Sequence, residues 1–130
     1  MTRILIIEDE PAIRRMIKTK LQREGFETRG ISDGRYAYDA CEEFCPDLVV
    51  TDIYMRFQDG LETIRELKKA FPALKIIAMS GRGNHSPGSY LGHADIFGAD
   101  ACFTKPLNWD LFMAAVKEMG APVRTNLTEP

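Results

Sequence analysis

Four short apolar runs in this sequence each end on polar side chains that could do chemistry. The run that begins at Leu48 ends on Asp52, and the other three end in the same manner on acids, a hydroxyl or an amine. A single acid after a strand often only caps a turn. Turn capping does not explain why four separate runs all end on such groups. We therefore treat the set as one candidate site, which consists of Glu8, Asp9, Asp52, Ser80 and Lys105.

The five side chains suit the chemistry of a phosphoryl group. Three carboxylates that lie close together repel one another, and a hard divalent cation such as Mg²⁺, which prefers oxygen ligands, is the simplest remedy. We therefore expect a magnesium site at Glu8, Asp9 and Asp52. Lys105 and Ser80 would add a positive charge and a hydrogen-bond donor, which favour a ligand rich in anionic oxygens. A carboxylate can itself accept a phosphoryl group as an acyl phosphate.

The elements that must position these side chains alternate between strand and helix along the chain. Apolar runs predict five strands, at 4–7, 26–29, 48–51, 74–79 and 101–104. Strand and helix in alternation imply a parallel sheet with right-handed crossovers and helices on both faces, an α/β fold. All strands of such a sheet end at one edge, so the polar groups are expected to meet there. The run 26–29 alternates apolar and polar residues, which is typical of an edge strand.

Apolar residues at helical spacing predict the helices between these strands. Pro11 suits the start of the first helix, Asp33 and Asp59 could cap the second and third, and Asn108 could cap the last. The glycine-rich segment 81–98 predicts a loop followed by a short helix. The residues expected to face the core are Ile13, Met16, Ile17 and Leu21; Ala37, Ala40, Cys41 and Phe44; Leu61, Ile64, Leu67 and Phe71; and Leu111, Phe112, Ala115 and Met119.

Composition indicates one globular domain. The chain has 130 residues, of which 45% are hydrophobic and 28% are charged, with a net charge of -2. Basic residues are spread along the chain, which gives no support for nucleic-acid binding. The apolar run at the N-terminus is too short for a signal peptide or a membrane span, so we expect a cytoplasmic protein with no membrane partner. Residues 1–120 are expected to form the domain, and residues 121–130, which lack apolar periodicity, a disordered tail.

With these motifs in this order, the chain resembles the receiver domain of a two-component response regulator. The resemblance covers residues 3 to about 119. It rests on Glu8-Asp9, on Asp52 with Met55 and Asp59-Gly60, on Ser80-Gly81, and on Gly98-Ala99-Asp100 leading to Lys105-Pro106. It implies a flavodoxin-like, doubly wound sheet in the strand order 2-1-3-4-5. It also implies a phosphorylation-dependent signalling switch rather than a conventional enzyme.

The resemblance implies particular roles for the site residues. Asp52 would accept a phosphoryl group from a phosphohistidine of a sensor histidine kinase or a histidine phosphotransfer protein. Asp9 and Asp52 would bind Mg²⁺ directly, Glu8 would bind it through water, and the backbone carbonyl of Tyr54 would complete the protein ligands. Lys105 would contact the phosphoryl group, and Ser80 would move to hydrogen-bond it. Because no output domain follows in these 130 residues, we expect a stand-alone receiver that either signals through contact with a separate protein or passes the phosphoryl group on to a phosphotransfer histidine.

The sequence also departs from the family pattern. Arg56 stands where relatives usually have proline, and Cys102 stands where they often have an aromatic residue, so we expect the switch to differ from the usual one. A receiver-like binding module that is not phosphorylated is the alternative, although such modules tend to lose one of the site residues that this chain retains. A phosphatase of the haloacid-dehalogenase type would need a second aspartate at the position of Tyr54.

Overall fold

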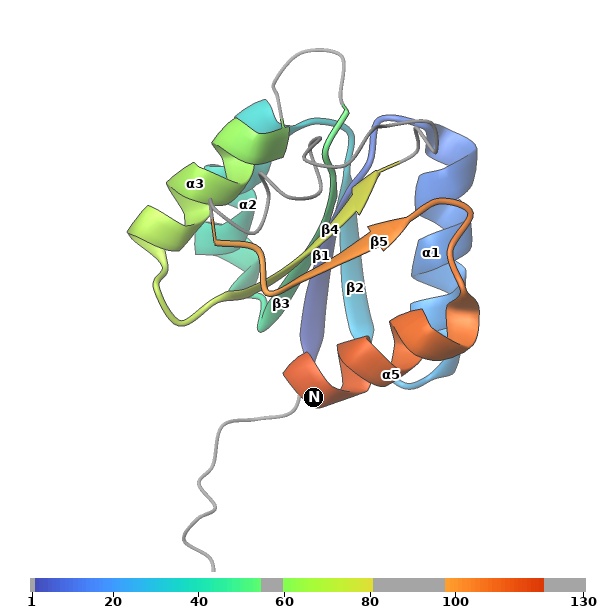
Figure 1. The fold of residues 1–130 in the computed structure, drawn as a ribbon. Helices are drawn as coiled ribbons and strands as arrows, with labels where there is room; N and C mark the ends of the chain where they lie inside the picture. Colours follow the sequence, from blue (N-terminus) through green and yellow to red (C-terminus); the bar gives the residue numbers. More distant parts are fainter. Residues whose placement is uncertain (1, 55–59, 81–97, 121–130) are drawn as a thin grey trace, which may run out of the picture.

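A computed structural model describes residues 2–54, 60–80 and 98–120, and its centre is a five-stranded parallel sheet (Figure 1). The strands β1 (Arg3–Ile7), β2 (Glu27–Ile31), β3 (Leu48–Asp52), β4 (Lys75–Ser80) and β5 (Ala101–Thr104) lie in the order β2-β1-β3-β4-β5. The helices are α1 (Pro11–Arg23), the short 3-10 helix η1 (Gly34–Tyr36), α2 (Ala37–Phe44), α3 (Gly60–Ala70) and α5 (Trp109–Met119). The predicted α/β fold and strand order 2-1-3-4-5 are confirmed.

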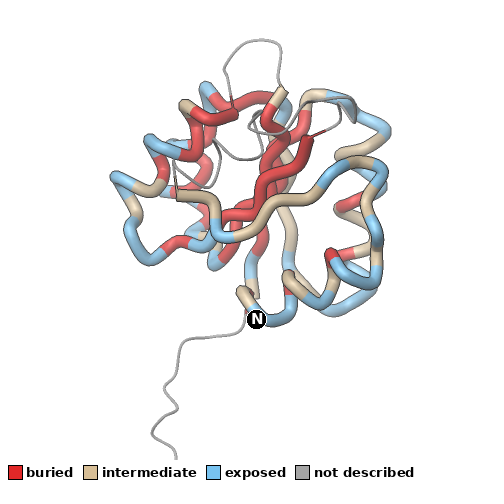
Figure 2. Tube along the Cα trace, in the orientation of Figure 1, coloured by how far each residue is buried: buried red, intermediate tan, exposed pale blue. Residues whose placement is uncertain are grey.

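The two faces of the sheet carry separate apolar cores because successive side chains of a strand point to opposite faces. In β1, Leu5 and Ile7 pack into the core under α2 and α3, whereas Ile4 and Ile6 pack into the core under α1 and α5. Figure 1 shows these helix pairs on opposite sides of the sheet. The central strands β1, β3 and β4 are buried on both faces (Figure 2), which is why their sequences are almost unbroken apolar runs.

Strand β2 lies at the edge of the sheet, as its alternating sequence predicts, and β1 is its neighbour. None of its residues is fully buried. The strand begins one residue later and ends two residues later than predicted, because pairing with β1 runs from Arg3↔Glu27 to Ile7↔Ile31. Parallel pairing over this length places Gly30 beside Ile6, on the face that α1 covers.

Two residues depart from the predicted helix faces. Met16 is 46% exposed and Leu111 is 61% exposed, so the prediction that they face the core is wrong. In each helix the fully buried residues lie four positions apart instead, Ile17 and Leu21 in α1, and Phe112 and Val116 in α5. Consecutive residues of a helix are about 100° apart around its axis, so a neighbour of a buried residue falls at the border of the buried face. None of the described helices combines the length and the apolar character needed to cross a membrane.

The predicted helix caps have different outcomes. Asn108 caps α5, since its side chain accepts a hydrogen bond from the backbone N–H of Leu111 at 3.1 Å. Asp33 accepts from the backbone N–H of Arg35 at 2.8 Å, so it caps η1, and α2 begins only at Ala37. Asp59 lies outside the described residues. So do Arg56, nearly all of the segment 81–98 and the whole segment 121–130.

Cys45 ends α2 in the left-handed conformation, with φ 54° and ψ 59°, and among the described residues only this non-glycine has positive φ. Side chains with a Cβ are strained there, whereas glycine is not. We expect Cys45→Gly to increase the free energy of unfolding by about 1 kcal/mol, measured by urea denaturation. Cys45→Ala is the control because it removes the thiol and keeps the Cβ. An equal gain in both variants would contradict the strain argument.

Candidate functional site

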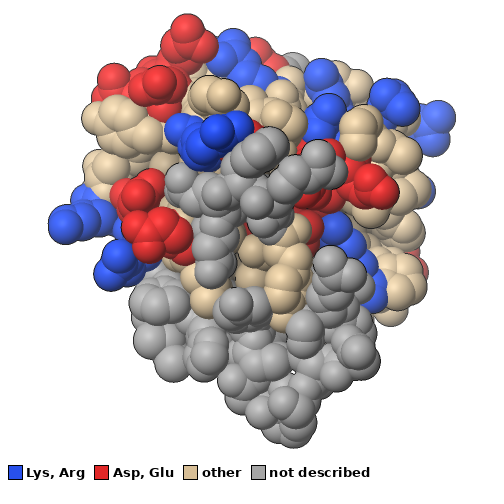
Figure 3. Space-filling view, turned by 90° about the horizontal axis from the view of Figure 1, so that it is seen from above, with Lys and Arg blue, Asp and Glu red and all other residues tan. Residues whose placement is uncertain are grey.

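The strands deliver the predicted site residues to one edge of the sheet. Glu8 and Asp9 directly follow β1, Asp52 is the last residue of β3, and Ser80 is the last residue of β4. Lys105 directly follows β5, and its backbone N–H donates to the carbonyl oxygen of Ser80 at 2.7 Å. Figure 3 views the molecule from above Figure 1, and one group of acidic side chains is visible to the right of the middle of this face, next to basic side chains.

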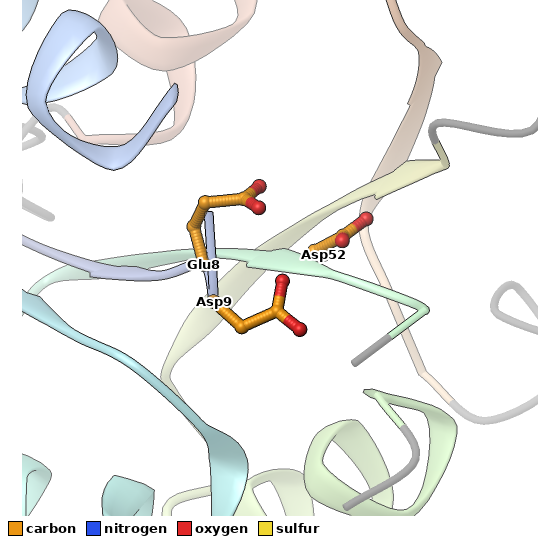
Figure 4. A group of neighbouring side chains, drawn as sticks. All are labelled: Glu8, Asp9 and Asp52. Atoms are coloured by element: carbon orange, nitrogen blue, oxygen red, sulfur yellow. The ribbon is translucent and has the colours of Figure 1, made fainter. Parts of the chain in front are cut away.

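Glu8, Asp9 and Asp52 form one acidic cluster. One carboxylate oxygen from each residue lies within 4.8 Å of those of the other two. Figure 4 shows the side chains at the end of β1 turned toward the side chain at the end of β3. Glu8 is 1% exposed and Asp52 is 4% exposed, whereas Asp9 is half-buried. The structure therefore brings the three predicted acids together in a place that water reaches only in part.

Lys105 neutralises part of this negative charge. Its Nζ lies 2.7 Å from Oε1 of Glu8 and 3.5 Å from Oδ2 of Asp52. The side chain of Lys105 is itself only 14% exposed, so these contacts are screened little by solvent. One ammonium between two carboxylates leaves a net negative charge in the cluster, before Asp9 is counted.

Burial raises the pKa of Asp52 from 3.8 to about 6. Loss of hydration is the largest cause, the negative charge of Glu8 raises the pKa further, and Lys105 lowers it again. Asp9 contributes a smaller increase. The ionised form of Asp52 is therefore held in the folded protein at a cost in free energy, which a bound cation would offset.

The donor set fits a hard divalent cation. Oδ1 of Asp52 is buried and accepts no hydrogen bond from the described residues, which leaves this oxygen available as a ligand. A buried, unpaired carboxylate oxygen is costly unless something coordinates it. One carboxylate oxygen of Asp52 lies within 4.8 Å of one oxygen of Glu8 and one of Asp9, and carboxylate oxygens are ligands that magnesium prefers over softer donors. Among the described residues, no other group of three acidic, histidine or cysteine side chains meets in this way.

Ser80 and Tyr54 flank the cluster. Ser80 is 1% exposed and follows Met79, whose Cα is paired in register with that of Asp52. Tyr54 lies two residues beyond Asp52, lines the same pocket as the acids and also packs against the core under α2 and α3. The roles predicted for the Ser80 hydroxyl and the Tyr54 carbonyl remain predictions.

The structure adds residues that the sequence pattern did not place at the site. The acids and Lys105 open into a pocket of about 630 Å³ whose other wall includes Ile13, Met16 and Trp109. Met16 is thus a pocket residue and not a core residue. Met16 directly precedes the buried Ile17, so it lies about 100° from Ile17 around the helix axis. That angle could have indicated that Met16 lies at the border of the buried face of α1.

Gly60 allows α3 to begin against the backbone that carries Asp52. A Cβ at residue 60 would lie 2.4 Å from the carbonyl oxygen of Asp52 and 2.6 Å from Cα of Ile53. The N–H of Gly60 donates to the carbonyl oxygen of Ile53 at 2.9 Å. Only a glycine fits this approach. The sequence motif Asp59-Gly60 therefore has a steric basis at its second residue.

Comparison with known proteins identifies the class. The family model described as the response regulator receiver domain matches residues 4–117. The chain belongs to this family, whose members are the phosphoacceptor domains of two-component systems and act as phosphorylation-dependent signalling switches.

Individual relatives agree with this assignment. The chain is 35% identical over 85 residues to the chemotaxis protein CheY of Thermotoga maritima. The matched region covers 65% of this chain and 71% of that protein. It is 32% identical over 128 residues to the DNA-binding response regulator MtrA of Mycolicibacterium smegmatis, over 98% of this chain. The chain spans about half the length of MtrA, 53%.

A solved structure has the same fold at a similar level of identity. It is the wild-type response regulator TrrA of Thermotoga maritima in complex with Mg(2+)-BeF, with a TM-score of 0.80 and 33% identity. The similarity covers 92% of this chain and 99% of that chain. The family assignment therefore rests on sequence and on structure together.

Proposed function

We propose that this chain accepts a phosphoryl group on Asp52 and so acts as a magnesium-dependent switch. The observation that carries the proposal is the carboxylate of Asp52 at the end of β3, buried among Glu8, Asp9 and Lys105, with Oδ1 unpaired among the described residues. An accessible pocket opens onto this carboxylate. The donor would be a phosphohistidine of a histidine kinase or of a histidine phosphotransfer protein.

The chemistry is a transfer between two nucleophiles. An oxygen of Asp52 forms a bond to phosphorus while the bond from phosphorus to the donor imidazole breaks, and the imidazole leaves with the electron pair and takes up a proton. Glu8, Asp9 and Asp52 would hold Mg²⁺, with Glu8 acting through water and the Tyr54 carbonyl as a further ligand. When bound, the metal supplies positive charge beside the phosphoryl oxygens.

Lys105 and Ser80 would act on the transferred group. The ammonium of Lys105 already lies 3.5 Å from Oδ2 of Asp52, which is within reach of an oxygen attached there. It would neutralise charge that develops on the phosphoryl group during transfer. The Ser80 hydroxyl would donate a hydrogen bond to the bound phosphoryl group, and this new contact at the end of β4 would start the conformational response.

The complex of TrrA with Mg(2+)-BeF supports this proposal, since that relative shares the fold at 33% identity. A downstream protein would then recognise the phosphorylated form of this chain. We propose that the domain works inside the cytoplasm, where a histidine kinase presents its phosphohistidine.

The test is intact-mass measurement after incubation with Mg²⁺ and phosphoramidate, a small donor with the same phosphorus–nitrogen bond. We expect a single phosphoryl adduct on the parent protein and on Asp39→Asn, an exposed acid on α2. We expect no adduct on Asp52→Asn, and none on the parent when the metal is chelated. An unmodified parent protein would favour the alternative, a receiver-like binding module that is not phosphorylated.

A further inference from the structure

Arg14 holds the backbone that carries the acidic cluster. Its Nη1 donates a hydrogen bond to the carbonyl oxygen of Glu8. That carbonyl belongs to the peptide group joining Glu8 to Asp9. A guanidinium fixed on this oxygen therefore restrains the plane of the peptide, and with it the direction in which Asp9 leaves the backbone.

The remaining groups of Glu8 are restrained as well. Its N–H donates to the carbonyl oxygen of Ile31 at 3.1 Å, Oε1 pairs with Lys105, and Oε2 accepts from the N–H of Glu10 at 3.1 Å. With Arg14 on the carbonyl oxygen, all the polar groups of Glu8 have partners. The turn between β1 and α1 is thus set before any ligand arrives.

Gly30 makes room for Arg14. A Cβ at residue 30 would lie 3.1 Å from both Cγ and Cδ of Arg14, closer than side chains normally pack. The aliphatic part of Arg14 therefore runs across the bare backbone of β2 before its guanidinium reaches Glu8. Glycine weakens a strand because it restricts the unfolded chain less and packs no side chain, so its place in the middle of β2 needs a reason. Close packing of Arg14 supplies one.

We propose that Arg14, seated on Gly30, is a positioning residue for the magnesium site. The inference rests on the proposed function, because it assumes that Glu8 and Asp9 serve the metal. Residues that orient metal ligands commonly change the metal affinity by about 10–100-fold when mutated, and loss of one backbone contact is expected at or below the lower end of this range.

The sign of the effect separates positioning from simple charge. Arg14 is a cation near a cation site, so by charge alone its removal would tighten Mg²⁺ binding. By positioning, its removal weakens binding. Arg15 is the matched control, because it is the next residue of α1, carries the same charge and is exposed.

The experiment measures the dissociation constant for Mg²⁺ alone by isothermal titration calorimetry. Arg14→Met keeps the aliphatic length that packs on Gly30 and removes the donors, and we expect it to raise the dissociation constant by about 3–10-fold. Arg15→Met is expected to leave the constant unchanged or to lower it. Equal shifts in both variants, or tighter binding by Arg14→Met, would overturn the proposal. A parent protein that binds no Mg²⁺ would overturn the proposed function and this inference together.

Gly30 provides a second, independent route to the same contact. Gly30→Val keeps the arginine but places methyl groups where its side chain lies, and valine favours strand structure. We expect Gly30→Val to weaken Mg²⁺ binding in the parent and to have no further effect in an Arg14→Ala background. If the melting temperature shows that Arg14→Met does not fold, Gly30→Val still tests the contact between Arg14 and Glu8. Equal effects of Gly30→Val in both backgrounds would show that Arg14 does not transmit the change.

Discussion

In the metal-free protein near neutral pH, Asp52→Asn is expected to raise the free energy of unfolding by about 2–3 kcal/mol. The folded-state pKa of Asp52 is about 6, against an ordinary 3.8, and each pKa unit corresponds to about 1.4 kcal/mol. The expected gain arises because the variant no longer keeps an ionised carboxylate buried beside Glu8. Urea denaturation in the presence of a chelator measures it.

The gain should depend on pH in a defined direction. Below a pH of 3.8 both the folded and the unfolded parent hold the proton on Asp52, so the variant should have little advantage there. As the pH rises from 3.8 to about 6, the unfolded chain releases the proton while the folded protein retains it, and the parent loses stability. Above about 6 the difference should be constant.

Two controls frame this result. Asp39→Asn removes an exposed acid from the first turn of α2 and should change stability by less than about 1 kcal/mol, downward if at all. Added Mg²⁺ should stabilise the parent more than Asp52→Asn, because it binds the native carboxylates. If Asp52→Asn does not increase the free energy of unfolding near neutral pH, ionised Asp52 does not destabilise the folded protein.

Lys105→Met is expected to have the opposite and equally large effect, a loss of about 3 kcal/mol in the metal-free protein. Its ammonium pairs with Glu8 and Asp52, whose side chains are 1% and 6% exposed. Methionine fills a similar volume but leaves two buried carboxylates side by side without a counter-charge. Removal of one partner from a buried ion pair is far more costly than removal from an exposed pair.

The matched control is Lys117→Met, which breaks the ion pair with Glu24 at 2.8 Å, where the two side chains are 56% and 41% exposed. That change should cost less than about 1 kcal/mol. The double variant Lys105→Met with Asp52→Asn should recover much of the loss, because one of the two unpaired charges is then gone. If Lys105→Met costs no more than Lys117→Met, the buried network does not stabilise the fold in the way its geometry indicates.

The sequence by itself determined the framework of the site. Apolar runs that alternate with helical patterns require parallel strands, and parallel strands end at one edge, so the neighbourhood of Glu8, Asp52 and Lys105 followed from the order of elements. The edge position of β2 followed from its alternating pattern. These features depend on periodicity and connectivity, which the sequence carries directly.

Only the tertiary structure decided how deep each group lies and which partner it has. The helical period places residues around an axis but does not fix the rotation of the helix on the sheet, so Met16 and Leu111 fall outside the core. The pairing of Lys105 with Glu8 depends on how far the lysine side chain extends toward the buried carboxylate. The hydrophobic pattern of the sequence does not determine that distance or the burial of the carboxylate. The contact of Arg14 with the Glu8 carbonyl oxygen, across Gly30, brings together α1, β2 and the end of β1. The sequence does not reveal this contact, because packing and not distance along the chain decides how close these three elements lie.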